Sequence, residues 1–155
     1  MASFPEKVNV LLVGGGGREH AIAWKLKQSK RLGTLYTTHP ENPGIAALAK
    51  PVDVPVSIRE IYRLQQFCDQ KQVHLVVIGP EEPLAEGFAD KLSSPMGAAP
   101  SAGNPAGGVP RVVFGPSKQA AQLEADKAMC KQVLRSASIP TGEARIFTDY
   151  HAALT

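Results

Sequence analysis

The amino-acid sequence predicts an α/β fold in which an open parallel sheet carries helices on both faces. Predicted strands and helices alternate along the chain. Two of the strands, residues 8–13 and 73–78, are almost entirely apolar, as expected for strands that are covered on both sides. The first strand continues through four glycines, residues 14–17, into a helix. This order of strand, glycine turn and helix is typical of a Rossmann-like sheet.

Each element is predicted from its own local pattern. A strand at 8–13 precedes a helix at 18–29 and a strand at 34–38. Ser57 is expected to cap a second helix that runs to about Lys71. The remaining elements are a strand at 73–78, a short helix at 83–92 and a strand at 111–114. The predicted apolar faces comprise Ala21, Ile22, Trp24 and Leu26 on the first helix, and Ile58, Ile61, Tyr62, Leu64 and Phe67 on the second.

Two features organise the second half of the chain. Residues 93–110 are rich in Pro, Gly, Ala and Ser and contain no charged or aromatic residue. Such a composition predicts a surface loop, and it favours a tolerated insertion over a functional lid. Ser117 and Asp126 are each expected to cap a helix in the segment that follows.

Composition excludes several classes of protein. With 155 residues, of which 43% are hydrophobic and 20% charged, the chain resembles an ordinary globular protein. No apolar run approaches the length of a membrane span and no signal peptide is recognisable, so we expect a cytoplasmic protein without a membrane partner. The net charge of +3 is weak support for nucleic-acid binding. The densest basic stretch, residues 25–31, closes the first helix, where cations complement the helix dipole, and we expect no nucleic-acid partner.

The cysteines and histidines do not predict a metal site. Cys68 and Cys130 have no Cys-x-x-Cys spacing, so two reduced, partly buried thiols are expected. The four histidines are scattered and form no pair at ligand spacing. They are therefore interpreted as surface or packing residues, at positions His20, His39, His74 and His151.

The glycine turn at residues 14–17 predicts an anion site. Residues without side chains allow close approach to the backbone, and the N-terminus of the following helix attracts a phosphate. The dinucleotide fingerprint fails, because Glu19 or His20 stands where its third glycine belongs. His39 follows the second strand, where a site for NAD would place an acidic residue. A phosphate ligand other than a standard dinucleotide is therefore expected, the alternative being that the glycines only allow close packing.

Two further groups of polar residues follow strands or begin helices. Glu81 comes soon after the strand at 73–78 and could accept hydrogen bonds from sugar hydroxyls or an amine. The same stretch also reads as a helix start, with Pro83 in the first turn. Lys127 and Lys131 lie one helical turn apart and are either solvated lysines or phosphate ligands.

Four motifs in fixed order together resemble the phosphoribosylamine–glycine ligase family, also called glycinamide ribonucleotide synthetase. They are GGGGREHA at 14–21, GPEEPL at 79–84, FGPSK at 114–118 and AAQLEADK at 120–127, continued by IPT at 139–141 and FTD at 147–149. The resemblance implies that residues 1–116 form a pre-ATP-grasp α/β domain, including the loop at 93–110. Residues 117–155 would then form linker helices and the start of a truncated ATP-grasp domain.

The resemblance also implies an activity. Family members use ATP to phosphorylate glycine, and the amine of 5-phosphoribosylamine attacks the glycyl phosphate to give glycinamide ribonucleotide, ADP and phosphate. This chemistry needs positioning and charge neutralisation, so no side chain of this chain is expected to act as a covalent catalyst. The ligands of magnesium or manganese, and most of the ATP site, are expected in a part of the family's sequence that this chain does not contain. The chain alone is therefore expected to be inactive.

Site residues follow from the matched motifs. The glycine turn and its helix start are expected to face the phosphoribosylamine through Gly15, Gly16, Gly17, Arg18 and Glu19. Further substrate contacts are expected from Asn42, Gly44, Pro80, Glu81, Gly115 and Ser117, with Glu81 near the ribose hydroxyls. Lys127 matches a lysine that reaches the nucleotide phosphates in ATP-grasp enzymes.

One departure concerns the loop after the second strand, where the family usually reads PGNxGT and this chain has PENPGI at 40–45. If the family glycine has a positive φ, Glu41 strains or reshapes the loop, and its side chain is expected to point to solvent. Two alternatives to the ligase remain: a different Rossmann-type nucleotide-binding domain, and a stand-alone module that binds a phosphoribosyl ligand.

Overall fold

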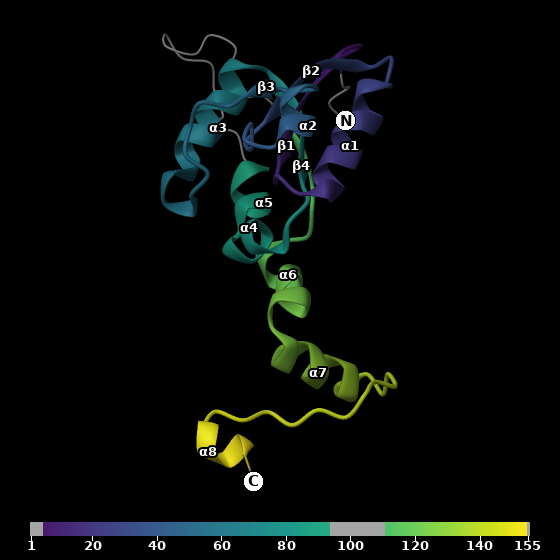
Figure 1. Ribbon diagram of the computed structural model, residues 1–155, viewed down its shortest axis with the longest axis vertical. Coiled ribbons are helices and arrows are strands. Elements are labelled where there is room, and N and C mark those ends of the chain that lie inside the picture. The colour runs from purple at the N-terminus through teal and green to yellow at the C-terminus, as the bar shows by residue number, and fades with distance from the viewer. Residues whose placement is uncertain (1–4, 94–110, 155) are drawn as a thin grey trace.

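The computed structural model describes residues 5–93 and 111–154, in which five parallel strands form one sheet of order β3-β2-β1-β4-β5 (Figure 1). The strands are β1 (Val8–Val13), β2 (Leu32–Thr37), β3 (Lys50–Pro51), β4 (Val73–Ile78) and β5 (Val112–Phe114). The helices are α1 (Gly17–Lys27), α2 (Pro43–Ala46), α3 (Ile61–Gln70), α4 (Glu81–Glu86), α5 (Phe88–Leu92), α6 (Lys118–Ala125), α7 (Lys127–Ser136) and α8 (Tyr150–Ala153), with a 3-10 turn, η1 (Ile58–Glu60), before α3. The predicted open parallel sheet is confirmed.

Helices cover both faces of the sheet, as predicted. Successive residues of a strand point to opposite faces, so β1 contributes to two cores. Leu11 belongs to the core beneath α3, α4 and α5, while Leu12 belongs to the core beneath α1, where Ala23 is fully buried. Figure 1 shows α1 and α3 on opposite sides of the sheet.

Several predicted elements differ from the structure. Sequence analysis missed α2 and β3, which have four and two residues and are too short to produce a periodic pattern. The helix predicted at 83–92 is two helices, because Gly87 adopts a φ of 99° and ends α4 in the left-handed conformation. The second strand begins two residues earlier than predicted, at Leu32.

Two aromatic residues assigned to helix cores are exposed. Trp24 on α1 is 59% exposed, and Tyr62 on α3 is 51% exposed. Each adjoins a buried residue: Trp24 follows Ala23, which was not assigned to the core, and Tyr62 follows Ile61, which was. Because neighbouring residues on a helix are about 100° apart, burying one turns the next away from the sheet.

Helices α6, α7 and α8 extend away from the sheet (Figure 1). The predicted caps are confirmed: Ser117 Oγ accepts from the Ala120 N–H, and Asp126 Oδ1 accepts from the N–H groups of Ala128 and Met129. In α6 only Ala121 is buried, and no residue of α7 or α8 is buried within the described part of the chain. The predicted loop at 93–110 lies outside the described residues, apart from its first residue.

Both cysteines are free thiols, as predicted. Cys68 is buried in α3, and burial raises the pKa of its thiol to about 12. It is therefore protonated at neutral pH and is a structural residue rather than a nucleophile. Within residues 5–93 and 111–154, no helix combines the length and the apolar character needed to cross a membrane.

Candidate sugar-phosphate site

The glycine turn lies at the carboxyl ends of β1 and β4. Gly14 has a φ of 117°, a conformation that favours glycine, and a Cβ built there would lie 2.6 Å from Pro80 Cδ. The Gly14 N–H donates to Thr38 Oγ1 over 3.4 Å, which links the turn to the end of β2. The turn then enters α1, whose first N–H groups have no carbonyl one turn earlier to bind. These donors and the positive end of the helix dipole can receive an anion.

Glu19 is buried beneath the turn. Its side chain folds back so that Oε2 accepts from the Gly16 N–H over 2.7 Å, and the residue is only 4% exposed. A Cβ built at Gly79 would overlap Glu19 Oε1, so a side chain at that position would have to displace the buried Glu19 carboxylate. Glu19 therefore holds the turn in shape from below, whatever contact it makes with a ligand.

Arg18 and Asn42 attach neighbouring segments to this turn. Arg18 Nη1 donates to the carbonyl of Gly79 over 2.7 Å, while most of the Arg18 side chain is exposed. Asn42 Nδ2 donates to the carbonyl of Gly15 over 2.7 Å, and its Oδ1 caps α2 by accepting from the Gly44 N–H. These hydrogen bonds join the three segments that follow β1, β2 and β4, at the carboxyl ends of the strands.

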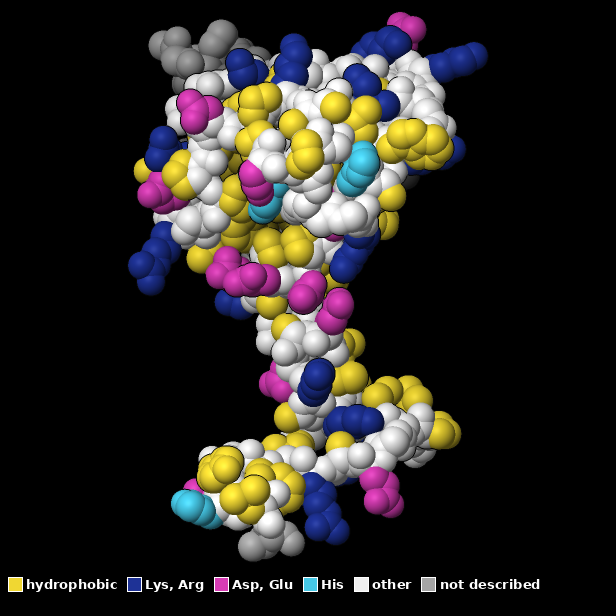
Figure 2. Space-filling view, viewed as in Figure 1, with side chains coloured by type: hydrophobic (Ala, Val, Ile, Leu, Met, Phe, Trp, Pro, Cys, Tyr) yellow, Lys and Arg dark blue, Asp and Glu magenta, His cyan; other side chains and the backbone are white. Residues whose placement is uncertain are grey.

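A cavity of about 490 Å³ opens over this junction. Figure 2 shows hydrophobic side chains bordered by acidic ones near the position that α4 has in Figure 1. Glu82 and Glu86, one turn apart on α4, supply carboxylates to the cavity. The lining residues are Gly14, Gly15, Gly16, Glu19, His39, Val56, Ser57, Pro80, Glu82, Pro83, Glu86 and Phe88.

Some of the residues expected in the site line this cavity and others do not. Gly15, Gly16, Glu19 and Pro80 line it. Four others lie beside it. Gly17 and Arg18 begin α1, and Asn42 and Gly44 belong to the start of α2. A Cβ on Gly44 would lie 2.5 Å from the His20 ring. Glu81 is exposed at the start of α4 and is not part of the lining.

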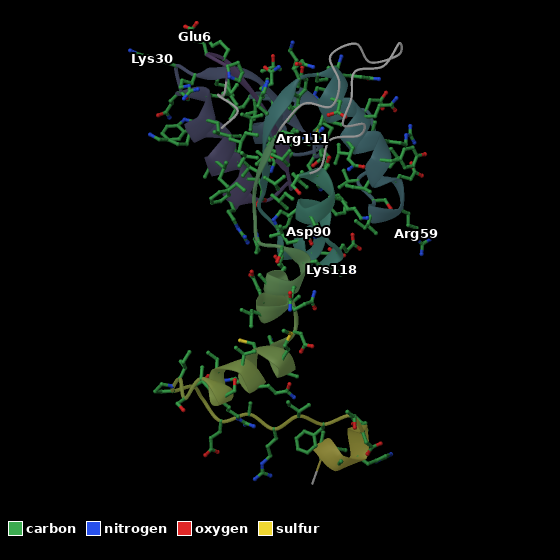
Figure 3. The ribbon with its side chains drawn as sticks, turned by 180° about the vertical axis from the view of Figure 1, so that it is seen from behind. Glu6, Lys30, Arg59, Asp90, Arg111 and Lys118 are labelled. Atoms are coloured by element: carbon green, nitrogen blue, oxygen red, sulfur yellow. The ribbon has the colours of Figure 1, made fainter. Side chains whose placement is uncertain are left out.

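The remaining expected residues lie toward α6 and α7. Gly115 packs against Leu84, since a Cβ built there would be 2.7 Å from Leu84 Cδ2. Ser117 caps α6, and Figure 3 shows Lys118 close to Asp90, whose Oδ2 accepts from the Lys118 N–H. Lys127 is an exposed residue at the start of α7.

Sequence reasoning did not select several residues that line the cavity. His39 was interpreted as a surface or packing residue and as the wrong residue for an NAD site, although its place directly after a strand is a usable signal. Glu82 and Glu86 have the i, i+4 spacing of one helix face, but this becomes visible only once α4 is known to begin at Glu81. Phe88 and Val56 come from distant segments and carry no local signal.

Glu41, at the departure from the family loop, does not strain the backbone. Gln72 and Ser138 are the described non-glycine residues with positive φ, so Glu41 does not have the strained conformation, and of the two expected effects only a reshaped loop is compatible with the structure. Its side chain is exposed, as predicted. Asn42 shapes the loop through its cap, and this arrangement does not need a glycine before it.

The parallel sheet, the glycine turn and the cavity at the carboxyl ends of its strands define a Rossmann-like domain with a site suited to a phosphate-bearing ligand. Comparison with known proteins identifies the family. Residues 8–124 match the family model described as phosphoribosylglycinamide synthetase, N domain. The chain belongs to this family.

Relatives extend the match. The chain is 40% identical over 147 residues to phosphoribosylamine–glycine ligase of Caldanaerobacter subterraneus subsp. tengcongensis, an alignment that covers 95% of this chain and 31% of the relative. It is 43% identical over 146 residues to the ligase of Rhizobium meliloti, covering 94% of this chain and 30% of the relative. It is 42% identical over 144 residues to the trifunctional purine biosynthetic protein adenosine-3 of Gallus gallus, covering 93% of this chain and 13% of the relative. The chain thus spans less than a third of the length of these relatives.

Among solved structures, a Rex-family repressor superposes with a TM-score of 0.41 and 13% sequence identity, covering 85% of this chain and 63% of that chain. That score is too low to support an argument about function.

Proposed function

We propose that this chain provides the 5-phosphoribosylamine side of a phosphoribosylamine–glycine ligase site. The observation that carries the proposal is the cavity over the glycine turn, in a chain that belongs to the N-domain family of this ligase. The phosphate of the ligand would accept from the first N–H groups of α1, with Arg18 adding positive charge. The complete reaction would join glycine to the ligand's amine, with ATP converted to ADP and phosphate.

The residues described here do not fit a metal site. Among residues 5–93 and 111–154, no group of three or more His, Cys, Asp or Glu side chains could hold a metal ion. We propose that magnesium or manganese, and most of the ATP contacts, belong to the part of the relatives that has no counterpart in this chain. Lys127 is the residue of this chain proposed to reach the nucleotide phosphates.

The proposal that this chain binds the sugar phosphate and not the nucleotide can be tested with ribose 5-phosphate, a stable analogue of the ligand that lacks the amine. We expect saturable binding by isothermal titration calorimetry, and we expect NADH neither to bind nor to compete. The Arg18→Ala variant should bind about tenfold more weakly, because a charge-assisted contact is lost. Lys25→Ala removes the same charge from the last turn of α1 and serves as the control that should bind normally.

The isolated chain should show no glycine-dependent formation of ADP. Such activity would contradict the proposal that the ATP site lies elsewhere. Saturable binding of NADH without competition from ribose 5-phosphate would instead favour a different Rossmann-type nucleotide-binding domain.

Asn42 provides a separate prediction. Asn42→Ala removes both the α2 cap and the hydrogen bond to the Gly15 carbonyl, so we expect a free energy of unfolding lower by about 1–2 kcal/mol and affinity for ribose 5-phosphate about tenfold weaker. Asn42→Ser retains a capping oxygen but cannot reach Gly15. It should therefore recover most of the stability in urea unfolding while binding stays weak. Normal binding by the Ser variant would show that the contact with Gly15 does not shape the turn.

A further inference from the structure

His39 is the one basic side chain among the described residues that line the cavity. It directly follows β2, the position from which Rossmann-like domains contact the ribose of a dinucleotide through an acidic side chain. Here an imidazole takes the place of that carboxylate. An imidazole can donate a hydrogen bond, whereas a carboxylate only accepts, and His39 lines the cavity.

The surrounding residues fix the orientation of the His39 ring. The ring lies against the glycine turn, since a Cβ built at Gly15 would be 2.9 Å from His39 Cβ and from His39 Cδ2. The His39 N–H donates to Thr37 Oγ1 over 3.1 Å, and His39 Nδ1 lies 2.7 Å from Thr38 Oγ1. Backbone and ring are therefore both anchored to the end of β2.

The hydrogen bonds around the His39 ring indicate whether its second nitrogen, Nε2, carries a proton. Thr38 Oγ1 accepts from the Gly14 N–H over 3.4 Å, and its own proton can be donated either to the Leu12 carbonyl, 3.5 Å away, or to His39 Nδ1, 2.7 Å away. The shorter distance favours donation by the Thr38 hydroxyl to His39 Nδ1. A neutral ring that accepts at Nδ1 carries its own proton on Nε2, and a charged ring carries protons on both nitrogens. Within the described part of the chain, Nε2 makes no hydrogen bond, so it presents a donor that no protein group uses.

The charged side chains that line the cavity favour binding of a phosphate at one end of the cavity. Glu82 and Glu86 place carboxylates on the α4 side, and Glu19 is buried beneath the turn with its Oε2 bound to the Gly16 N–H. Two carboxylates on α4 repel an anion there. At the start of α1 the Glu19 carboxylate is offset by the Gly16 N–H, by Arg18 Nε at 3.9 Å from Glu19 Oε1, and by the helix dipole, so an anion is better placed at that end. His39, packed on Gly15, stands at the favourable end.

We propose that His39 is a specificity-determining residue that donates Nε2–H to a phosphate oxygen of the sugar phosphate. The inference rests on the proposed function and adds a residue to it. The imidazole selects a phosphorylated sugar, whereas the carboxylate of a dinucleotide site selects free ribose hydroxyls.

Three variants of the chain test this role through the dissociation constant for ribose 5-phosphate at neutral pH. His39→Leu keeps a side chain of similar size without a donor and should bind about tenfold more weakly. His39→Gln restores an N–H donor at similar reach and should bind within about threefold of wild type. His39→Asp places a negative charge beside the phosphate and should bind more weakly than the Leu variant.

The outcomes separate the inference from the proposed function. Melting temperatures establish whether each variant is folded. If His39→Leu is unfolded, the affinities of His39→Gln and His39→Asp for ribose 5-phosphate are compared instead, and equal affinities would overturn the role of His39. Wild-type affinity in His39→Leu would overturn the role of His39 while leaving the proposed function intact. Wild-type affinity in His39→Asp would show that the side chain meets a hydroxyl and would overturn the assignment to phosphate. Absence of binding by the wild-type chain would contradict the proposed function and this inference with it.

Discussion

Replacing Gly14 by Ala should lower the free energy of unfolding by about 3 kcal/mol and abolish binding of ribose 5-phosphate. Two costs combine at this position. A φ of 117° is strained for any residue with a Cβ, and the new methyl group would lie 2.6 Å from Pro80 Cδ and 2.8 Å from Glu19 Cγ. Relief of the overlap must displace Pro80, which lines the cavity, or Glu19, which holds the turn.

The matched control is Gly17→Ala in the same run of glycines. Gly17 does not have a positive φ, is the first residue of α1, and has no atom within 4 Å of a built Cβ. Alanine there should leave the free energy of unfolding unchanged or raise it by a few tenths of a kcal/mol, because alanine favours a helix. Urea unfolding of both variants measures the difference. Equal stability of the two would show that the turn tolerates a side chain at Gly14.

Much of the fold could be predicted because its central elements have strong local signals. The bounds of β1 and β4 agree with the sequence prediction, since both strands are buried on two faces and nearly all their residues are apolar. Ser117 and Asp126 were recognised as caps because short polar side chains at helix starts bind free N–H groups. The split at Gly87 was missed, since a single glycine in an otherwise helical pattern does not reveal its φ.

The site could be predicted only in part, for a different reason. The glycine turn is a contiguous motif, and its position between strand and helix is readable along the chain. The cavity also depends on which segments meet in space. Ser57 was predicted as a helix cap, and it does cap η1, yet the same residue lines the cavity. His39 and Phe88 approach the turn only after the sheet order brings the ends of β2, β1 and β4 together.

The largest expected loss of stability comes from an ion pair outside the site. Arg111, labelled in Figure 3, lies just before β5. Its fully buried side chain pairs through Nη2 with Asp69 Oδ1 at the end of α3. Arg111 Nε and Nη1 are buried and bind no other described residue. Asp69→Ala would leave the guanidinium buried without its counter-charge. We expect the free energy of unfolding to fall by about 4 kcal/mol, because an uncompensated buried charge is strongly destabilising.

A double variant tests whether charge, rather than lost packing, causes that effect. Asp69→Leu combined with Arg111→Met removes both charges and keeps apolar volume at the contact between α3 and β5. Its free energy of unfolding should lie within about 1–2 kcal/mol of wild type, since buried ion pairs are often replaceable by apolar residues. Urea unfolding of the single and double variants gives both values. If the double variant were as unstable as Asp69→Ala, the pair would stabilise the fold through its specific geometry, and the desolvation of Arg111 would not be the dominant cost.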